Sequence, residues 1–129
     1  MLMKIAAIFA VTITILAIGC ANQPKTRNYL IPSDLQVAQQ ANELSFESKF
    51  INNVITLRGK VDSVEERLSP GLRVTVSDDS HSIDCNTADD QRAVLEALRQ
   101  GQEIEVSGTL EHSFFGFDLY NCKVTNTMN

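Results

Sequence analysis

From residue 54 onward, apolar and polar residues alternate in five short runs. These runs cover residues 55–61, 72–77 and 81–85, then residues 104–110, and a last run that begins at Phe117. Alternation with a period of two places the apolar side chains on one face of a half-buried strand. The pattern therefore predicts five β-strands.

The fifth run departs from strict alternation. If the strand were regular, Cys122 and Val124 would lie on the opposite face from Leu119. This pattern predicts either a β-bulge near Tyr120 and Asn121 or a strand that is buried on both faces.

Two segments have a helical rather than an alternating pattern. Residues 34–50 repeat apolar or small residues every three to four positions, with Ser33 as the predicted N-cap and Gln36 completing a capping box. The pair Asn52-Asn53 predicts the end of this helix. A second helix is predicted over residues 88–100, between the third and fourth strands.

The order of these elements indicates the fold. Three strands, a helix and two further strands form the layout of an OB-fold barrel. Gly59 and Gly108 fall on the inner faces of the first and fourth strands, where a small closed barrel must bend sharply. We therefore predict a mainly β domain over residues 33–125, a five-stranded OB-fold barrel with an N-terminal helix and a helix between strands 3 and 4. The alternative is an open α+β sheet.

The first twenty residues have the pattern of an export signal. Lys4 is followed by an uncharged run over residues 5–18, which is shorter than the roughly 20 apolar residues of a spanning helix. The run ends in Leu16-Ala17-Ile18-Gly19-Cys20, which resembles the lipobox of bacterial lipoproteins.

The lipobox resemblance implies the fate of this segment. In that family the cysteine sulfur receives a diacylglycerol, the chain is cut before the cysteine, and the new amine is acylated, typically with palmitate. We predict a signal peptide over residues 1–19 and a lipidated Cys20 with a tether over residues 20–32. Ala21, where aspartate favours inner-membrane retention, favours the outer membrane if the cell is Gram-negative. The alternative is an ordinary cleaved signal with a chance cysteine.

Composition and charge narrow the function classes. Of 129 residues, 43% are hydrophobic and 21% charged, which is a globular composition. The net charge is −5. Removal of residues 1–19 takes away only Lys4, and the 10 basic and 16 acidic residues that remain give −6. A general nucleic-acid binder needs a basic surface, so no nucleic-acid partner is predicted.

A family resemblance extends over about residues 38–124. The chain resembles the tRNA_anti-like group of OB-fold putative lipoproteins. The motifs that carry it are Ala41-Asn42-Glu43, Ile55-Thr56-Leu57-Arg58-Gly59-Lys60-Val61, Ile83-Asp84-Cys85, Leu98-Arg99-Gln100-Gly101-Gln102, Ile104-Glu105-Val106-Ser107-Gly108 and Leu119-Tyr120-Asn121-Cys122. The resemblance implies the fold and the cell envelope, and it assigns no chemistry.

Two cysteines remain once Cys20 is committed to lipid. Cys85 and Cys122 lie on the third and fifth strands, which are neighbours in an OB barrel. Export places them where thiols oxidise, so we predict a disulfide between them, with two buried thiols as the alternative. No Cys-x-x-Cys motif is present, which argues against a redox role.

The remaining polar residues suggest little chemistry. His81 lies near Asp78, Asp79 and Asp84, but this pattern is typical of a hairpin turn and is favoured over a metal site. The sequence has no His-Glu-x-x-His, no phosphate loop and no nucleophile elbow. We therefore predict no cofactor, no metal and no enzymatic activity.

A candidate ligand face lies on strands two and three and the turn after strand four. Arg73 and Thr75 point outward, and Phe114 and Phe115 occupy the turn. An exposed ring there would suit a protein or peptide partner, whereas the alternative is that both rings cap the barrel. The sequence thus predicts a lipid-anchored, periplasm-facing binding or adaptor module. A structural or envelope-stress lipoprotein without a specific ligand is the first alternative, and a hydrolase of envelope polymers is the second.

Overall fold

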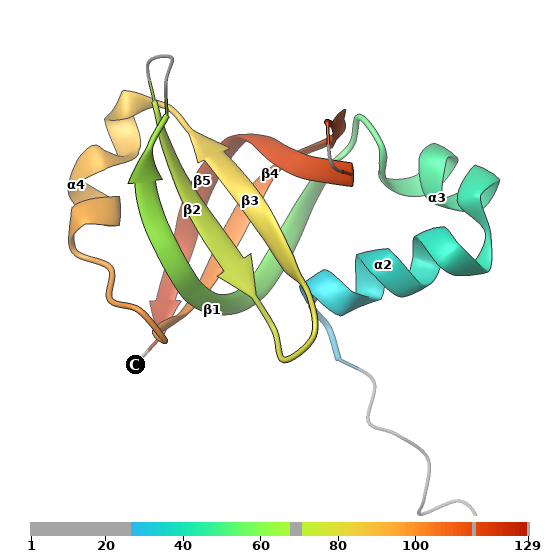
Figure 1. Cartoon of the computed structure of the whole chain (residues 1–129), viewed down its shortest axis with the longest axis horizontal. Coiled ribbons are helices and arrows are strands. Elements are labelled where there is room, and N and C mark those ends of the chain that lie inside the picture. Colours follow the sequence, from blue (N-terminus) through green and yellow to red (C-terminus); the bar gives the residue numbers. More distant parts are fainter. Residues whose placement is uncertain (1–26, 68–70, 115, 129) are drawn as a thin grey trace, which may run out of the picture.

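The computed structural model describes residues 27–67, 71–114 and 116–128 (Figure 1). The predicted signal peptide, Cys20 and Phe115 lie outside these residues. Within them, no helix is long and apolar enough to cross a membrane. The elements are α2 (Pro32–Ala41), α3 (Glu43–Phe50), β1 (Val54–Glu66), β2 (Leu72–Ser77), β3 (Ser82–Thr87), the 3₁₀ helix η1 (Asp89–Gln91), α4 (Arg92–Glu96), β4 (Glu103–Ser113) and β5 (Gly116–Met128).

The five strands close into a barrel in the order β1-β2-β3-β5-β4. All neighbours are antiparallel except β3 and β5, which are parallel, with Cys85 opposite Leu119. Strand β1 serves two partners, because residues 54–60 pair with β4 and residues 60–66 pair with β2. The predicted OB-fold barrel is confirmed, and the open-sheet alternative is wrong.

Helices close the two ends of the barrel core. Figure 1 shows α2 and α3 at one end of the barrel and α4 at the other. Leu35 and Phe46 are buried on α2 and α3, and Leu95 is buried on α4. These three side chains join the inward residues of the strands in one apolar cluster. Burial of this cluster is the main force that holds the helices to the sheet.

The first predicted helix starts earlier than expected and is broken. Its N-cap is Ile31 rather than Ser33, because Pro32 at the first helical position has a preset φ and no N–H to leave unpaired. The side chain of Asp34, not Gln36, accepts the Ile31 N–H at 2.9 Å. Asn42 then interrupts the helix with an extended backbone and caps α3 by accepting the Ser45 N–H at 3.0 Å.

Other boundaries also differ from the predictions. The helix expected over residues 88–100 is only η1 and the short α4, after which the chain turns at Gly101 with φ of 84°. The strands β1 and β5 continue to Glu66 and Met128, beyond the apolar alternation that marked them. The ends of β1 and β5 pair with neighbouring strands although their residues are polar. The apolar alternation in the sequence therefore does not predict how far these strands extend.

The predicted bulge in β5 is present. Ser107 pairs with Lys123 and Thr109 pairs with Tyr120, so β5 contains one extra residue there. Asn121 has a positive φ of 49°, which asparagine tolerates better than most residues. The bulge turns both Leu119 and Cys122 into the core.

Residues 27–31, which we call the strap, lie against β1. Leu30 forms a parallel bridge with Leu57, and the Arg58 N–H donates to the Leu30 carbonyl at 2.8 Å. These residues belong to the segment 20–32 that was predicted as a tether. In the structure they are hydrogen-bonded to β1.

Candidate functional site

The predicted ligand face on β2 and β3 is a closed polar network. The Arg73 guanidinium lies 3.2 Å from a carboxylate oxygen of Glu65 and 3.9 Å from one of Asp84. The Thr75 hydroxyl donates to Asp84 at 2.8 Å. The structure thus brings Arg73 and Thr75 together through Asp84. The positive charge of Arg73 is balanced by two carboxylates within the same face.

Asp118, which sequence reasoning missed, extends this face onto β5. Burial raises the pKa of Asp118, and the nearby charge of Asp84 raises it further, while hydrogen bonds with Ser113 and Asn86 act in the opposite direction. Because β3 and β5 are parallel neighbours, the two carboxyl groups meet across the strands. The bulge and the register of β5 bring the carboxyl groups of Asp84 and Asp118 near each other. No sequence motif predicts this proximity.

The β4–β5 turn places an aromatic ring at the edge of the face. The side chain of Phe114 is 93% exposed, so it does not cap the barrel. Phe117 packs inward instead, with its ring centroid 5.2 Å from that of Phe46. Ser113, next to Phe114, is bonded to Asp118, which connects the turn to the polar face.

Cys85 and Cys122 form a disulfide in the structure, with their Cα atoms 5.5 Å apart. Both residues are buried. The bond joins β3 to β5 beside their parallel pairing, so it is a structural link rather than an accessible redox pair.

The β2–β3 turn uses the carboxylate of Asp78 for hydrogen bonds to the backbone. Asp78 accepts backbone N–H groups from Ser33, Ser80 and His81 at 2.7 to 2.9 Å. Burial alone would raise the pKa of Asp78, but a hydrogen bond with the Ser33 side chain and these three backbone hydrogen bonds outweigh it and hold the pKa at about 2. The His81 ring is bonded to the Ser33 hydroxyl at 3.0 Å. Across the described ranges, no group of three metal-ligating side chains gathers.

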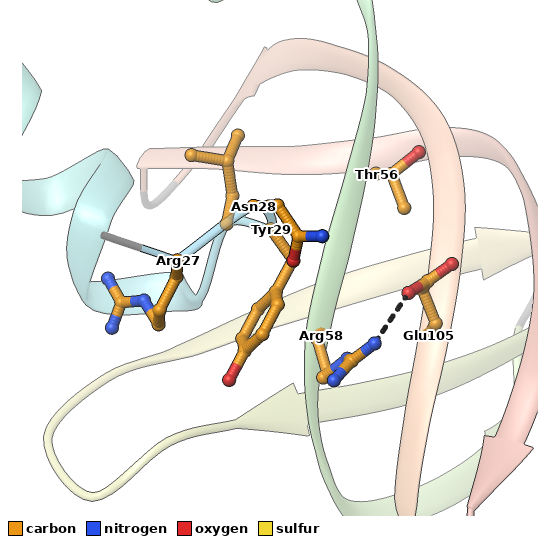
Figure 2. A pocket seen from close by; sticks show the side chains of 7 residues that line it. Arg27, Asn28, Tyr29, Thr56, Arg58 and Glu105 are labelled. Atoms are coloured by element: carbon orange, nitrogen blue, oxygen red, sulfur yellow. Dashed lines mark hydrogen bonds and ion pairs between the residues drawn. The ribbon is translucent and has the colours of Figure 1, made fainter. Parts of the chain in front are cut away.

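A pocket of about 590 Å³ lies on a different side of the barrel, between the strap, β1 and β4. We call it the strap pocket, and Figure 2 shows it from close by. It is lined by Arg27, Asn28, Tyr29, Leu30, Thr56, Arg58 and Glu105.

In the strap pocket, two arginine side chains lie on either side of an aromatic ring. The Tyr29 ring lies in the middle, with the Arg58 guanidinium 4.1 Å and that of Arg27 5.9 Å from its centroid (Figure 2). Arg27 is paired with Asp34 at 2.6 Å, and Arg58 with Glu105 at 3.3 Å. The lining therefore holds two guanidinium groups and one carboxylate, and Asp34 on α2, which is not part of the lining, pairs with Arg27.

The Arg58 guanidinium is held by stacking more than by hydrogen bonds. Glu105 is its only acceptor in the part of the chain that the structure describes. Its Nε atom is buried without a partner. Guanidinium has five N–H donors, so most of the donor capacity of this residue is unused by the protein. The pocket was not predicted because residues 27–31 were interpreted as a tether.

Comparisons with known proteins give a fold and no family. No family model matches the chain, and no curated protein matches it. A solved structure named "putative nucleic acid-binding lipoprotein" from Klebsiella pneumoniae subsp. pneumoniae MGH 78578 is similar, with a TM-score of 0.61 and 17% identity over 81% of this chain and 100% of the other. A "putative aspartyl-tRNA synthetase" from Leishmania major Friedlin is similar at TM-score 0.53 and 14% identity, over 83% of this chain and 22% of that one. Both likenesses show the fold alone.

Proposed function

We propose that this chain is a lipid-anchored module of the cell envelope that faces the periplasm and binds a protein or peptide partner without catalysing a reaction. The observation that carries the proposal is the Gly19-Cys20 junction after a short apolar run, followed by an OB barrel that contains a disulfide. Disulfides are typical of exported domains. The similar Klebsiella protein is also named a lipoprotein, which supports the same anchor.

Fatty-acid labelling of the full chain in cells tests the anchor. Cys20→Ser removes the thiol that would receive the diacylglycerol, so we expect loss of the label and accumulation of an unprocessed precursor. Ala17→Leu, which brings the junction nearer to the usual lipobox, is the matched control and should keep the label. Undiminished labelling of the Cys20→Ser protein would contradict the anchor and leave only a cleaved signal or a chance cysteine.

The binding role rests on the polar face and its aromatic border. A photo-crosslinking residue at Thr75 or at Phe114 should capture one envelope protein or peptide from cells that express the acylated chain. A crosslinker at Thr125, an exposed position on β5 that bonds Glu105 beside the strap pocket, is the control. Capture at all three positions alike, or at none, would favour a structural lipoprotein without a specific ligand.

The name of the Klebsiella protein raises nucleic acid as an alternative ligand. Single-stranded nucleic acid is held by aromatic platforms in a positive groove. On the described β2–β3 face, Arg73 is neutralised by Glu65 and Asp84, and Asp118 adds a further acid. The chemistry of the face therefore favours a protein or peptide partner.

The pair Asp84 and Asp118 is the one arrangement that favours a hydrolase of envelope polymers, since glycosidases use two carboxyl groups. Asp84 is already engaged by Thr75 and Arg73, and neither acid lines the strap pocket. Catalytic carboxyls normally lie in a cleft that holds the substrate. We therefore infer a non-enzymatic module, and Ala21 after the lipidated cysteine favours the outer membrane if the cell is Gram-negative. Release of soluble fragments from purified envelope polymer by the wild type, but not by Asp118→Asn, would contradict this inference.

A further inference from the structure

The position of the strap limits how the barrel can lie on a membrane, given the lipid anchor proposed above. Six residues, 21–26, separate Cys20 from Arg27. Seven Cα–Cα steps span at most about 25 Å, and a flexible segment of that length has an end-to-end distance of about 15 Å. A domain of this size has a radius of gyration of about 13 Å, so its diameter exceeds the usual reach of the tether. The side of the barrel that holds Arg27 therefore faces the bilayer.

The strap fixes this orientation because it is bound to the barrel wall. The Leu30 carbonyl accepts the Arg58 N–H, and the Tyr29 ring stacks on the Arg58 guanidinium. The chain thus leaves the domain at the strap pocket itself, and the pocket lies on the membrane-facing side.

The chemistry of the strap pocket matches a zwitterion. Arg27 and Arg58 are guanidinium groups that bind phosphate oxygens well, and Glu105 is a carboxylate that binds an ammonium group. Because each guanidinium is already paired with a carboxylate, and the chain without residues 1–19 has a net charge of −6 from 10 basic and 16 acidic residues, a purely anionic group has no electrostatic advantage here. Tyrosine is common at membrane interfaces, where one end of the side chain is apolar and the other is hydrated.

We propose that the strap pocket binds the zwitterionic headgroup of a phospholipid in the bilayer that holds the Cys20 lipid. The phosphate contacts the unused donors of Arg58 and Arg27, and the ammonium group contacts Glu105. No bond forms or breaks. The bound headgroup keeps the strap pocket against the bilayer. The polar face of β2 and β3 then has a fixed orientation relative to the membrane.

Tyrosine fluorescence can locate the bilayer, because the chain has two tyrosines and no tryptophan. The acylated full chain is reconstituted in phosphatidylethanolamine vesicles that contain a lipid with a spin-labelled headgroup. Tyr120→Phe leaves Tyr29 as the reporter, and Tyr29→Phe leaves Tyr120, which lines a different pocket with Asn86 and Glu111. We expect the label to quench Tyr29 several-fold more strongly than Tyr120. Equal quenching, or stronger quenching of Tyr120, would overturn the proposal.

A comparison of two lipid headgroups shows whether the strap pocket binds a headgroup or only lies near the bilayer. In the Tyr120→Phe background, which is kept for every variant below, Tyr29 should be quenched several-fold more in phosphatidylethanolamine than in phosphatidylglycerol vesicles with the same acyl chains. Glu105→Gln should abolish this preference, and Arg58→Gln should reduce quenching in both. Arg92→Gln, on α4, removes an arginine that is also paired with a carboxylate but lies outside the strap pocket, and it should behave as the unchanged background. A preference that survives in Glu105→Gln would overturn headgroup recognition.

Two further measurements make the outcomes distinguishable. Circular dichroism of each variant checks that the barrel is folded. Fatty-acid labelling of the same samples checks the anchor. An unlabelled chain refutes the proposed function, whereas a labelled and folded chain whose Tyr29 is not quenched refutes only the headgroup site.

Discussion

At the residue scale, Asp78 acts as a cap for a helix that lies 45 positions earlier in the chain. Its carboxylate accepts the N–H of Ser33, in the first turn of α2, as well as two N–H groups of its own turn. We predict that Asp78→Asn lowers the free energy of unfolding by about 1 kcal/mol at pH 7, because a neutral amide oxygen accepts these hydrogen bonds less strongly than a carboxylate does. The midpoint of urea unfolding measures this change, and Asp79→Asn, on the exposed neighbour, is the control.

The pH dependence of the Asp78 effect follows from its pKa. The folded pKa of about 2 is below the ordinary value of 3.8, so the charged form stabilises the fold. This stabilisation is present above pH 4 and is lost as the pH falls from 4 to 2. The gap between wild type and Asp78→Asn should therefore narrow over that range. A gap that stays constant to pH 2 would contradict the assignment.

Asp118 is the opposite case on the polar face. Burial and the charge of Asp84 raise its pKa, so the folded state binds the proton more tightly than the unfolded state. Stability from this group is present in acid and is lost as the pH rises through the ordinary range of a carboxyl pKa and above it. We predict that Asp118→Asn, which removes the charge and keeps an acceptor for Asn86, stabilises the fold at pH 7 by a few tenths of a kcal/mol. The gain should disappear near pH 3 in the same urea titration, and destabilisation at pH 7 would contradict it.

At the scale of elements, two strand glycines allow the barrel to close. A Cβ added at Gly59 would lie 2.6 Å from a Val76 methyl and 2.8 Å from the Ser77 carbonyl oxygen. A Cβ added at Gly108 would lie 2.9 Å from the backbone carbonyl oxygen of Tyr120 and 3.1 Å from the Cα of Cys122. The close approach at both positions agrees with the inward glycines of the sequence pattern.

We predict that Gly59→Ala and Gly108→Ala each cost about 2 kcal/mol, because backbone atoms must move to admit the methyl group. Gly101→Ala is the control, since a Cβ there meets nothing within 4 Å and only the positive φ of 84° is unfavourable. It should cost about 1 kcal/mol. Urea unfolding of the three variants gives the order, and a larger loss at Gly101 than at the strand glycines would contradict the packing argument.

The Cys85–Cys122 bond links β3 to β5, two strands that are also joined by a parallel pairing and by the hydrogen bond from the Asn86 side chain to the Leu119 carbonyl. A bridge across 37 residues is worth about 3–4 kcal/mol in the chain-entropy description. We predict that a non-reduced digest of periplasmic protein yields a linked peptide pair, and that Cys85→Ala with Cys122→Ala lowers the free energy of unfolding by about that amount. Two thiols that alkylate freely under denaturing, non-reducing conditions would contradict the prediction.

The sequence predicted the strands well and the helices poorly, for a physical reason. Strand alternation is imposed by a barrel interior that is continuous, so it is visible across Gly59, and its break in the fifth strand marks the bulge at Asn121. The helices are short plugs that bury only a few side chains, such as Leu35 and Phe46, and their weak periodicity concealed the break at Asn42. Contacts between distant residues, such as Glu47 with His112 at 2.7 Å, leave no local pattern.

At the scale of the whole molecule, the same limit applies to the candidate sites. Arg73 and Thr75 could be assigned to the outer face from alternation alone. Asp118 and the strap pocket depend on the register of β5 and on residues 27–31 folding back onto β1, and neither is encoded in local spacing. Two polar regions of the described barrel therefore differ. On the face of β2 and β3, ion pairs within the protein neutralise Arg73, whereas in the strap pocket several N–H donors of Arg58 have no acceptor among the described residues.

The charge of the whole molecule leads to a last prediction, on nucleic acid. Each phosphate contact requires a cation that displaces counterions, yet the processed chain has 10 basic and 16 acidic residues. Arg27, Arg58 and Arg73 are each paired with a carboxylate. We therefore expect no saturable binding of a labelled 20-nucleotide DNA or RNA strand by fluorescence polarisation at about 150 mM salt, with a dissociation constant weaker than about 10⁻⁴ M. Glu65→Lys with Asp118→Lys reverses the charge of the polar face and should bind measurably more tightly at low salt. Micromolar binding by the wild type, lost in Arg73→Ala, would show instead that the face reads nucleic acid despite its acids.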